Sequence, residues 1–188
     1  MSMRKLALAV ILTSVALYAG KYNVDTAHSS VAFKVKHMMI SNVKGSFNKF
    51  TGLFEYDEKT NQVVALAGHI KTASINTNNV KRDKHLKSDD FFDAVKYPSV
   101  DFILTKIKDD NAYGKLTMHG ITKEVKLDFE NNGLVKDPRG NTRVGLAMSG
   151  KINRKDFGLA YNKVLETGGI LIGNVIKLDI EIEGILAK

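Results

Sequence analysis

One segment, Lys81 to Phe102, gathers the side chains of this sequence that could do chemistry. It reads KRDKHLKSDDFFDAVKYPSVDF, with charges of both signs, one histidine and two adjacent phenylalanines. His85 and Asp89 could exchange protons with a bound substrate, whereas the forked donors of Arg82 suit a phosphate or the oxygens of a quinone or phenol. Acidic residues here also suit the start of a helix. The segment therefore predicts a polar collar, with catalysis as a second hypothesis.

The histidines do not have the spacing of a metal site. No two are separated as i, i+2 on a strand or as i, i+4 on a helix, and the chain has no cysteine. The five are His28, His37, His69, His85 and His119. The sequence also lacks G-x-S-x-G, H-E-x-x-H and a glycine-rich phosphate loop. We therefore predict no metal site and no enzymatic activity.

The first 19 residues have the layout of a secretory signal peptide. Two basic residues precede an apolar run from Leu6 to Leu17, and small residues follow, so cleavage is expected after Ala16 or Ala19. The run is shorter than the ~20 residues that cross a membrane. We predict export to the periplasm, with residues 20–188 as one mature domain and no integral membrane segment in it. A buried N-terminal helix is the alternative.

The charge of the chain is basic but dispersed. There are 28 Lys and Arg against 20 Asp and Glu, a net charge of +8. The lysines stand singly along the chain, without an arginine-rich block or the interleaved aromatic residues of an RNA-binding surface. Among nucleic acid, an anionic membrane and plain solubility, this pattern favours a solvated basic face. No nucleic-acid partner is predicted.

Apolar and polar residues alternate with period two along most of the chain. In VIKLDIEIEG, Val175 to Gly184, four branched side chains share one face and charged residues occupy the other. About eight such runs, separated by turn signals such as DPRGN, predict an all-β fold with an antiparallel sheet. Closure into an eight-stranded barrel would leave room for side chains or one small ligand. Glycines within the runs favour a coiled barrel over a sandwich.

The segment that interrupts the strands has helical spacing. Asn78 or Asn79 can cap a helix that begins near Val80, and Ser88 can cap a second one. Tyr97-Pro98 ends the excursion before the next strand. A helical insertion of one or two short helices is therefore predicted over an open end of the barrel.

Four stretches together resemble the YceI-like family of bacterial exported proteins. They are YNVDTAHSSVAFKVKH, SINTNNVKRDKHLKSDDFFDAVKYPSVDF, GKLTMHGITKEVKLDF and INRKDFGLAYN with GGILIGNVIKLDIEIE. The resemblance covers the chain from about Tyr22 to its end. It implies an extended, lipocalin-like, eight-stranded antiparallel β-barrel whose hydrophobic pore holds a polyisoprenoid or another long-chain amphiphile.

Three groups of residues are candidates for such a site. We expect lining of the pore by Phe33, Val35, Phe47, Phe54, Phe102, Phe129, Leu146, Met148, Ile176, Leu178, Ile180 and Ile182. We expect a polar collar at the entrance from Arg82, Asp83, His85, Asp89 and Asp90. Phe91 and Phe92 would dock the insertion on the barrel and contact the ligand tail. For each apolar residue ordinary core packing is the alternative, and for Arg82 and Asp83 it is ion pairing within the fold.

These features predict an exported binding protein that sequesters or carries a long-chain isoprenoid lipid, quinone-like or polyprenyl, with no cofactor besides that ligand. An enzyme acting on such a lipid is one alternative. A ligand-free stress or adhesion protein with a fully packed barrel is another. A homodimer through strand edges stays open.

Overall fold

The computed structural model describes residues 19–164, 166 and 169–188 of the chain. The expected signal peptide and both of its expected cleavage sites therefore lie outside, or at the very start of, the described residues. Among the described residues, no helix is long and apolar enough to cross a bilayer.

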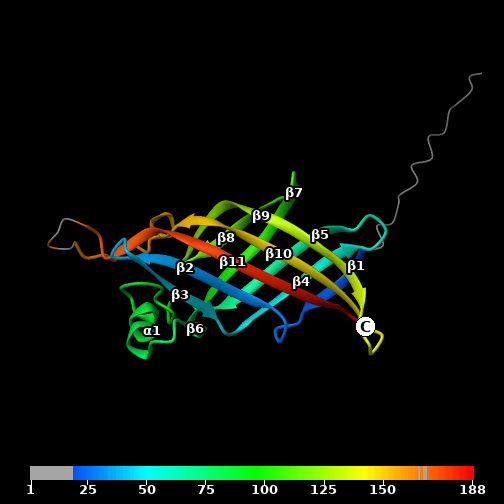
Figure 1. The fold of residues 1–188 in the computed structure, drawn as a ribbon, viewed down its shortest axis with the longest axis horizontal. Helices are drawn as coiled ribbons and strands as arrows, with labels where there is room; N and C mark the ends of the chain where they lie inside the picture. Colours follow the sequence, from blue (N-terminus) through cyan, green and yellow to red (C-terminus); the bar gives the residue numbers. More distant parts are fainter. Residues whose placement is uncertain (1–18, 165, 167–168) are drawn as a thin grey trace, which may run out of the picture.

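Eight antiparallel strands close into a barrel, which confirms the predicted fold class (Figure 1). Neighbouring strands follow one another around the wall, and the last pairs with the first. In order around the barrel they are β1 (Ala19–Val24), β4 (Phe50–Asp57), β5 (Gln62–Lys71), β7 (Ser99–Lys108), β8 (Asn111–Met118), β9 (Ile121–Lys136), β10 (Thr142–Asn153) and β11 (Ile172–Leu186).

Three further strands extend the wall at one end. β2 (Ser30–His37) pairs with the first part of β11, while β1 pairs with its last residues. β3 (Ser41–Phe47) pairs with β2 and with the short β6 (Ile75–Asn76). β1 and β2, which are consecutive in the chain, thus act as one long strand that is interrupted once. β3 and β4 act as a second such strand. This makes the barrel longer on the side of the helical insertion.

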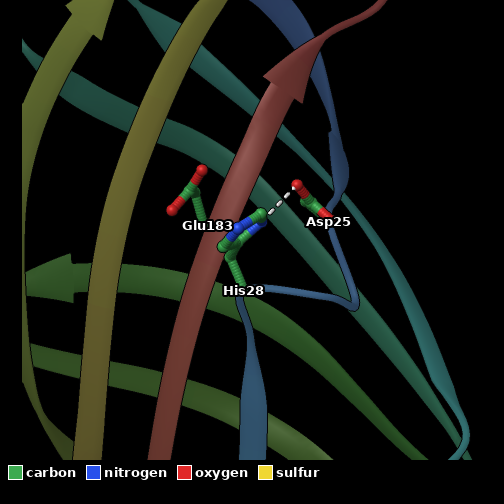
Figure 2. A group of neighbouring side chains, drawn as sticks. All are labelled: Asp25, His28 and Glu183. Atoms are coloured by element: carbon green, nitrogen blue, oxygen red, sulfur yellow. Dashed lines mark hydrogen bonds and ion pairs between the residues drawn. The ribbon is translucent and has the colours of Figure 1, made fainter. Parts of the chain in front are cut away.

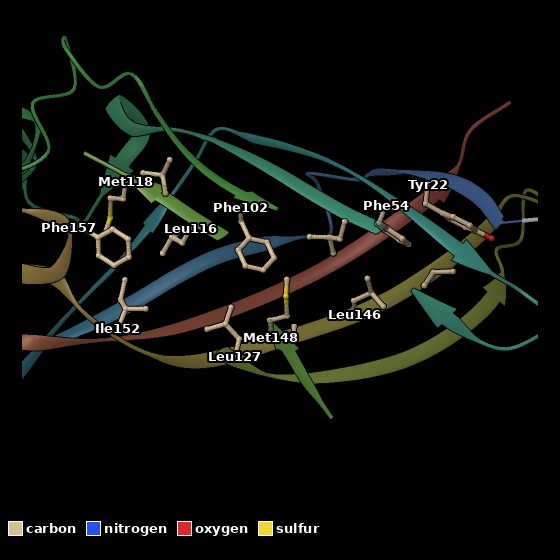
Figure 3. Close-up of a cluster of buried hydrophobic side chains, with 14 of the residues drawn as sticks. Tyr22, Phe54, Phe102, Leu116, Met118, Leu127, Leu146, Met148, Ile152 and Phe157 are labelled. Carbon is tan, nitrogen blue, oxygen red and sulfur yellow. The ribbon is translucent and has the colours of Figure 1, made fainter. Parts of the chain in front are cut away.

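Aromatic side chains fill the opposite end of the barrel. Tyr22 is fully buried and stacks on Phe54, with ring centroids 5.2 Å apart, and it meets Tyr56 edge to face at 6.0 Å. Gly184 permits this approach, because a Cβ there would lie 2.3 Å from the Phe54 ring. Figure 3 shows Tyr22 and Phe54 at one end of a buried row that reaches Phe157 at the other. One end of the barrel is therefore closed by packing.

The insertion contains one α-helix, α1 (Val80–Lys87). Asn79 caps it as expected, its side chain accepting a hydrogen bond from the backbone N–H of Arg82 at 3.0 Å. The second helix considered at Ser88 is replaced by turns, because the Ser88 hydroxyl donates back to the carbonyl of His85 and terminates α1. The 3₁₀ turns η1 (Thr72–Ser74) and η2 (Arg154–Phe157) complete the fold.

Candidate functional site

An apolar cavity of ≈ 180 Å³ lies inside the barrel, between the aromatic closure and the helical insertion. Side chains from nearly every strand form its wall, because the period-two alternation turns the apolar face of each strand inward. Leu86, Phe91 and Phe92 of the insertion cover its open end. The insertion therefore lies over the mouth, as the sequence predicts.

Most of the residues expected to line the pore lie on this wall. They are Phe33, Val35, Phe47, Phe102, Met148, Ile176, Leu178, Ile180 and Ile182. Phe47 and Phe92 meet edge to face at 6.0 Å, so the insertion is docked on the barrel through an aromatic contact. Contact of these residues with a ligand stays a prediction.

Three of the expected lining residues lie elsewhere. Phe54 and Leu146 belong to the packed end, with exposures of 1% and 0%, and Phe129 packs against the core without reaching the cavity. Alternation predicted that their strands turn these side chains inward. It carried no information on where along the barrel axis packing gives way to open space.

Several wall residues were missed by the sequence reasoning. Leu66, Ile70, Val100, Leu116, Met118 and Ile152 all line the cavity. Alternation alone could have identified them, since each stands on an inward-facing position. Gly68 also lines it, and a Cβ added there would have nothing within 4 Å, so this glycine leaves space open in the lumen.

A second cavity of ≈ 230 Å³ adjoins the first at the mouth. The two share Phe33, Val35, Leu86, Phe91 and Ile172 as lining residues. Five basic residues border the outer cavity and form its rim, namely Lys36, His37, Arg82, His85 and Lys163. A molecule spanning both would place its apolar part inside and its polar part at the rim.

Arg82 and Asp83 of the predicted collar hold the helix in place. The Arg82 guanidinium donates to the hydroxyl and carbonyl oxygens of Thr77 at 2.7 and 2.9 Å, and Asp83 accepts from the Thr77 N–H at 2.9 Å. Thr77 is 4% exposed. The pair therefore has a structural role, but through hydrogen bonds to Thr77 rather than the ion pairs expected, while Arg82 also borders the outer cavity.

His85 contacts Asp90 rather than Asp89 within the collar. Its Nε2 lies 2.7 Å from a carboxylate oxygen of Asp90. The imidazole meets the rings of Phe91 and Tyr161, each at 4.9 Å between centroids. Asp89 is exposed and does not border either cavity. The Asp89–His85 arrangement considered for catalysis is thus not assembled.

Arg154 is a buried cation on the cavity wall that the sequence reasoning did not single out. It is 3% exposed, and burial lowers the pKa of its guanidinium. Its N–H groups donate to the carbonyl oxygens of Gly173 at 3.0 Å, Tyr161 at 2.9 Å and Leu159. The sequence does indicate that Arg154 faces inward, because it continues the inward-facing alternation of β10 through Ile152. A charged residue at such a position needs partners inside the fold.

Asp25, His28 and Glu183 come together at the break between β1 and β2, near the closed end of the barrel (Figure 2). Their potential ligand atoms lie within 4.8 Å of one another. Arg143 already contacts both carboxylates, at 2.8 Å from Asp25, and a third one on Asp137 at 2.8 Å. A metal would have to displace this guanidinium, so the cluster is better suited to holding chain segments together.

The Arg143 cluster predicts a loss of stability in acid. Arg143 and His28 hold the pKa of Asp25 at about 2, and Asn141 with Arg143 holds the pKa of Asp137 well below its ordinary range. Because both values lie below the unfolded value of ~3.9, this stabilisation is present above about pH 4 and is lost as the pH falls toward 2. Denaturant unfolding between these pH values should show the decrease.

Arg143→Met is expected to flatten that decrease, whereas Arg139→Met, at an exposed arginine nearby, should leave it unchanged. An equally steep pH dependence in Arg143→Met would contradict the assignment to this cluster.

A closed antiparallel barrel with a covered apolar cavity and a basic rim defines a lipocalin-like, ligand-holding class of architecture. The YceI-like domain model matches residues 22–184. This chain belongs to the YceI-like family. The UPF0312 protein SAS2572 of Staphylococcus aureus is 39% identical over 163 residues, which cover 86% of this chain and 95% of that protein.

Solved structures share the fold. The YceI protein of Campylobacter jejuni is 32% identical, with a TM-score of 0.70, and the match covers 99% of this chain and 100% of that one. BcnA of Burkholderia cenocepacia is 20% identical with a TM-score of 0.69, covering 85% and 98%. A polyisoprenoid binding domain from Saccharophagus degradans is 14% identical with a TM-score of 0.67, covering 88% and 98%.

Proposed function

We propose that this protein is an exported, periplasmic binding protein that holds a long-chain isoprenoid lipid and carries or protects it in water. The observation that carries the proposal is the apolar cavity inside the barrel, which opens into a second cavity with a basic rim. Together the two fall within the ~300–1,000 Å³ range of ligand pockets. A fully packed barrel, the ligand-free alternative, would have no such space.

The chemistry of the walls matches an isoprenoid tail. Branched and aromatic side chains line the inner cavity, and each CH₂ buried there is worth ~0.8 kcal/mol. A tail that buries roughly a dozen such groups gains on the order of 10 kcal/mol, of which ordering and lost translation remove several. Micromolar or tighter binding follows. A polyisoprenoid binding domain shares this fold, which supports the same ligand class here.

Selectivity would come from the rim. An apolar tunnel discriminates poorly between tails that differ by one methylene. Arg82, His85 and Lys36 border the outer cavity, where basic side chains favour a phosphate or the oxygens of a quinone or phenol. We infer a polar, oxygen-rich head group at this place. Binding is the proposed activity, because branched and aromatic side chains line the inner cavity and a polyisoprenoid binding domain shares the fold.

A series of prenols tests the proposal. Geraniol, farnesol and geranylgeraniol differ by one isoprene unit each, and each added unit should lower Kd at least about tenfold, since several more CH₂ groups become buried. Competition against a fluorescent fatty probe would measure the series. Affinity that does not depend on tail length would show that the tail stays outside the cavity.

A further inference from the structure

The turn between β2 and β3 exposes apolar side chains at the mouth of the barrel. Met38, Met39 and Ile40 form its tip and are 39%, 58% and 82% exposed. Figure 1 shows this hairpin tip and α1 at the same end of the molecule, opposite the C-terminus. The hairpin also contributes Lys36 and His37 to the rim of the outer cavity. The tip therefore projects beside the entrance to the ligand site.

The fold alone does not explain methionines at this turn. Met38 and Met39 have φ values of 50° and 64°, in the left-handed region that suits Gly, Asn and Asp. The β7–β8 turn has the same geometry at Asp109 and Asp110, with φ values of 50° and 55°. All the other non-glycine residues with positive φ in the described chain are Asn, Asp or His. Two exposed methionines thus occupy positions where their conformation and their exposure are both unfavourable.

A row of lysines crosses the outer wall just behind the tip. Lys44 pairs directly with Lys34, Lys34 with Lys177, and Lys177 with Lys151, so four adjacent strands present one cation each. Like charges directly opposite one another are unfavourable in a sheet. None of the four is within ion-pair distance of an acidic group in the described part of the chain.

The face that carries this lysine row is polarised along the barrel axis. On β11, Lys177 is followed toward the closed end by Asp179, Glu181 and Glu183, which point to the same side by alternation. The positive end of the face is therefore the mouth end. An anionic surface would attract the molecule mouth first.

We propose that the mouth of the barrel docks on an anionic lipid bilayer, with the Met38–Ile40 tip inserted among the lipids and the lysine row at the level of the head groups. Lys34 and Lys44 stand about three residues from the turn, or roughly 10 Å at strand rise, which matches the 5–10 Å depth of interfacial insertion. The positive charge of the lysine row favours an anionic bilayer over a neutral one. In this orientation the cavity entrance faces the membrane, and a lipid tail can pass between them without crossing water.

Flotation with lipid vesicles tests the docking. The full mature protein should bind vesicles of phosphatidylcholine mixed with phosphatidylglycerol, bind weakly to phosphatidylcholine alone, and dissociate as salt is raised. Lys34→Gln/Lys44→Gln should weaken binding about 25-fold, since each lysine near an anionic surface contributes roughly a factor of five. Lys21→Gln/Lys136→Gln removes the same charge at the closed end and should bind like the wild type.

A turn variant separates docking from folding. Met38→Asn/Met39→Gly suits the left-handed turn, so Tm should hold or rise while vesicle binding falls at least about tenfold. Val135→Ser, at an apolar side chain 62% exposed near the closed end, should change neither quantity. The proposal is overturned if the wild type does not bind anionic vesicles, or binds both vesicle types equally. It is also overturned if the turn variant only lowers Tm, or abolishes a dimer instead of vesicle binding. Each of these outcomes is independent of the prenol measurements.

Discussion

Replacing Gly68 by phenylalanine is expected to abolish binding of a long apolar tail while the barrel stays folded. An added Cβ meets no atom within 4 Å, so the new side chain starts in open space and its ring is expected to extend into the lumen. Gly68 stands beside Gly52 on β4 and Phe102 on β7, in the middle of the cavity. A ring that displaces about four buried CH₂ groups of the ligand removes ~3 kcal/mol, which is more than a hundredfold in Kd.

The matched control is Ala65→Phe, on the same strand but at an exposed position. Prenol titration and thermal unfolding of the two variants would be compared with the wild type. We expect lost binding with an unchanged Tm in Gly68→Phe, and no change in binding in Ala65→Phe. Wild-type affinity in Gly68→Phe would mean that the tail does not occupy this cavity.

Arg154→Met is expected to lower the free energy of unfolding by about 3 kcal/mol, because carbonyl groups that now accept from the guanidinium would be left without partners. Those of Leu159, Tyr161 and Gly173 belong to the segment after η2 and to the start of β11, so one side chain ties the two together at the mouth. For a chain of this size the loss corresponds to about 6–12 °C in Tm.

Lys155→Met is the control for Arg154→Met, since Lys155 is the exposed neighbour on the same 3₁₀ turn. It should change Tm by no more than about 2 °C, as expected for surface substitutions. Arg154→Lys keeps the charge but has fewer donors with a different geometry, and it should recover only part of the lost stability. A Tm for Arg154→Met equal to that of the wild type would show that water replaces the guanidinium without loss.

The barrel could be predicted from the sequence because its signal is local. Alternation from Ile176 to Ile182 specifies which side chains of a strand face inward, and turn residues specify where strands end. The cap at Asn79 and the place of the insertion follow from equally local rules. Family resemblance and physical pattern lead to the same architecture, an eight-stranded barrel covered by a short helical segment.

The depth of the cavity could not be predicted in the same way. Phe54 and Phe102 have the same inward pattern, yet one closes the barrel end and the other lines open space. The difference depends on Tyr22 and Gly184, which meet Phe54 from distant parts of the chain. Contacts of this kind are set by strand register, which a pattern of residue types does not contain.

The lysine row illustrates the same limit for charge. Lys34, Lys44, Lys151 and Lys177 are separated by 10 to 143 positions and appear in the sequence as dispersed, solvated cations. Only the register of four strands brings them into one line. A basic face that looks unremarkable in composition thus becomes a candidate membrane contact.

Ligand binding is tested most simply by mass spectrometry of an organic extract of the mature protein, purified from the periplasm to which we propose that it is exported. We expect a stoichiometric isoprenoid lipid whose head group carries a phosphate or oxygens of a quinone or phenol. The same extraction of Gly68→Phe should yield none. A wild-type protein that is free of lipid, and that also takes up no added isoprenoid, would show that the barrel does not hold this class of ligand.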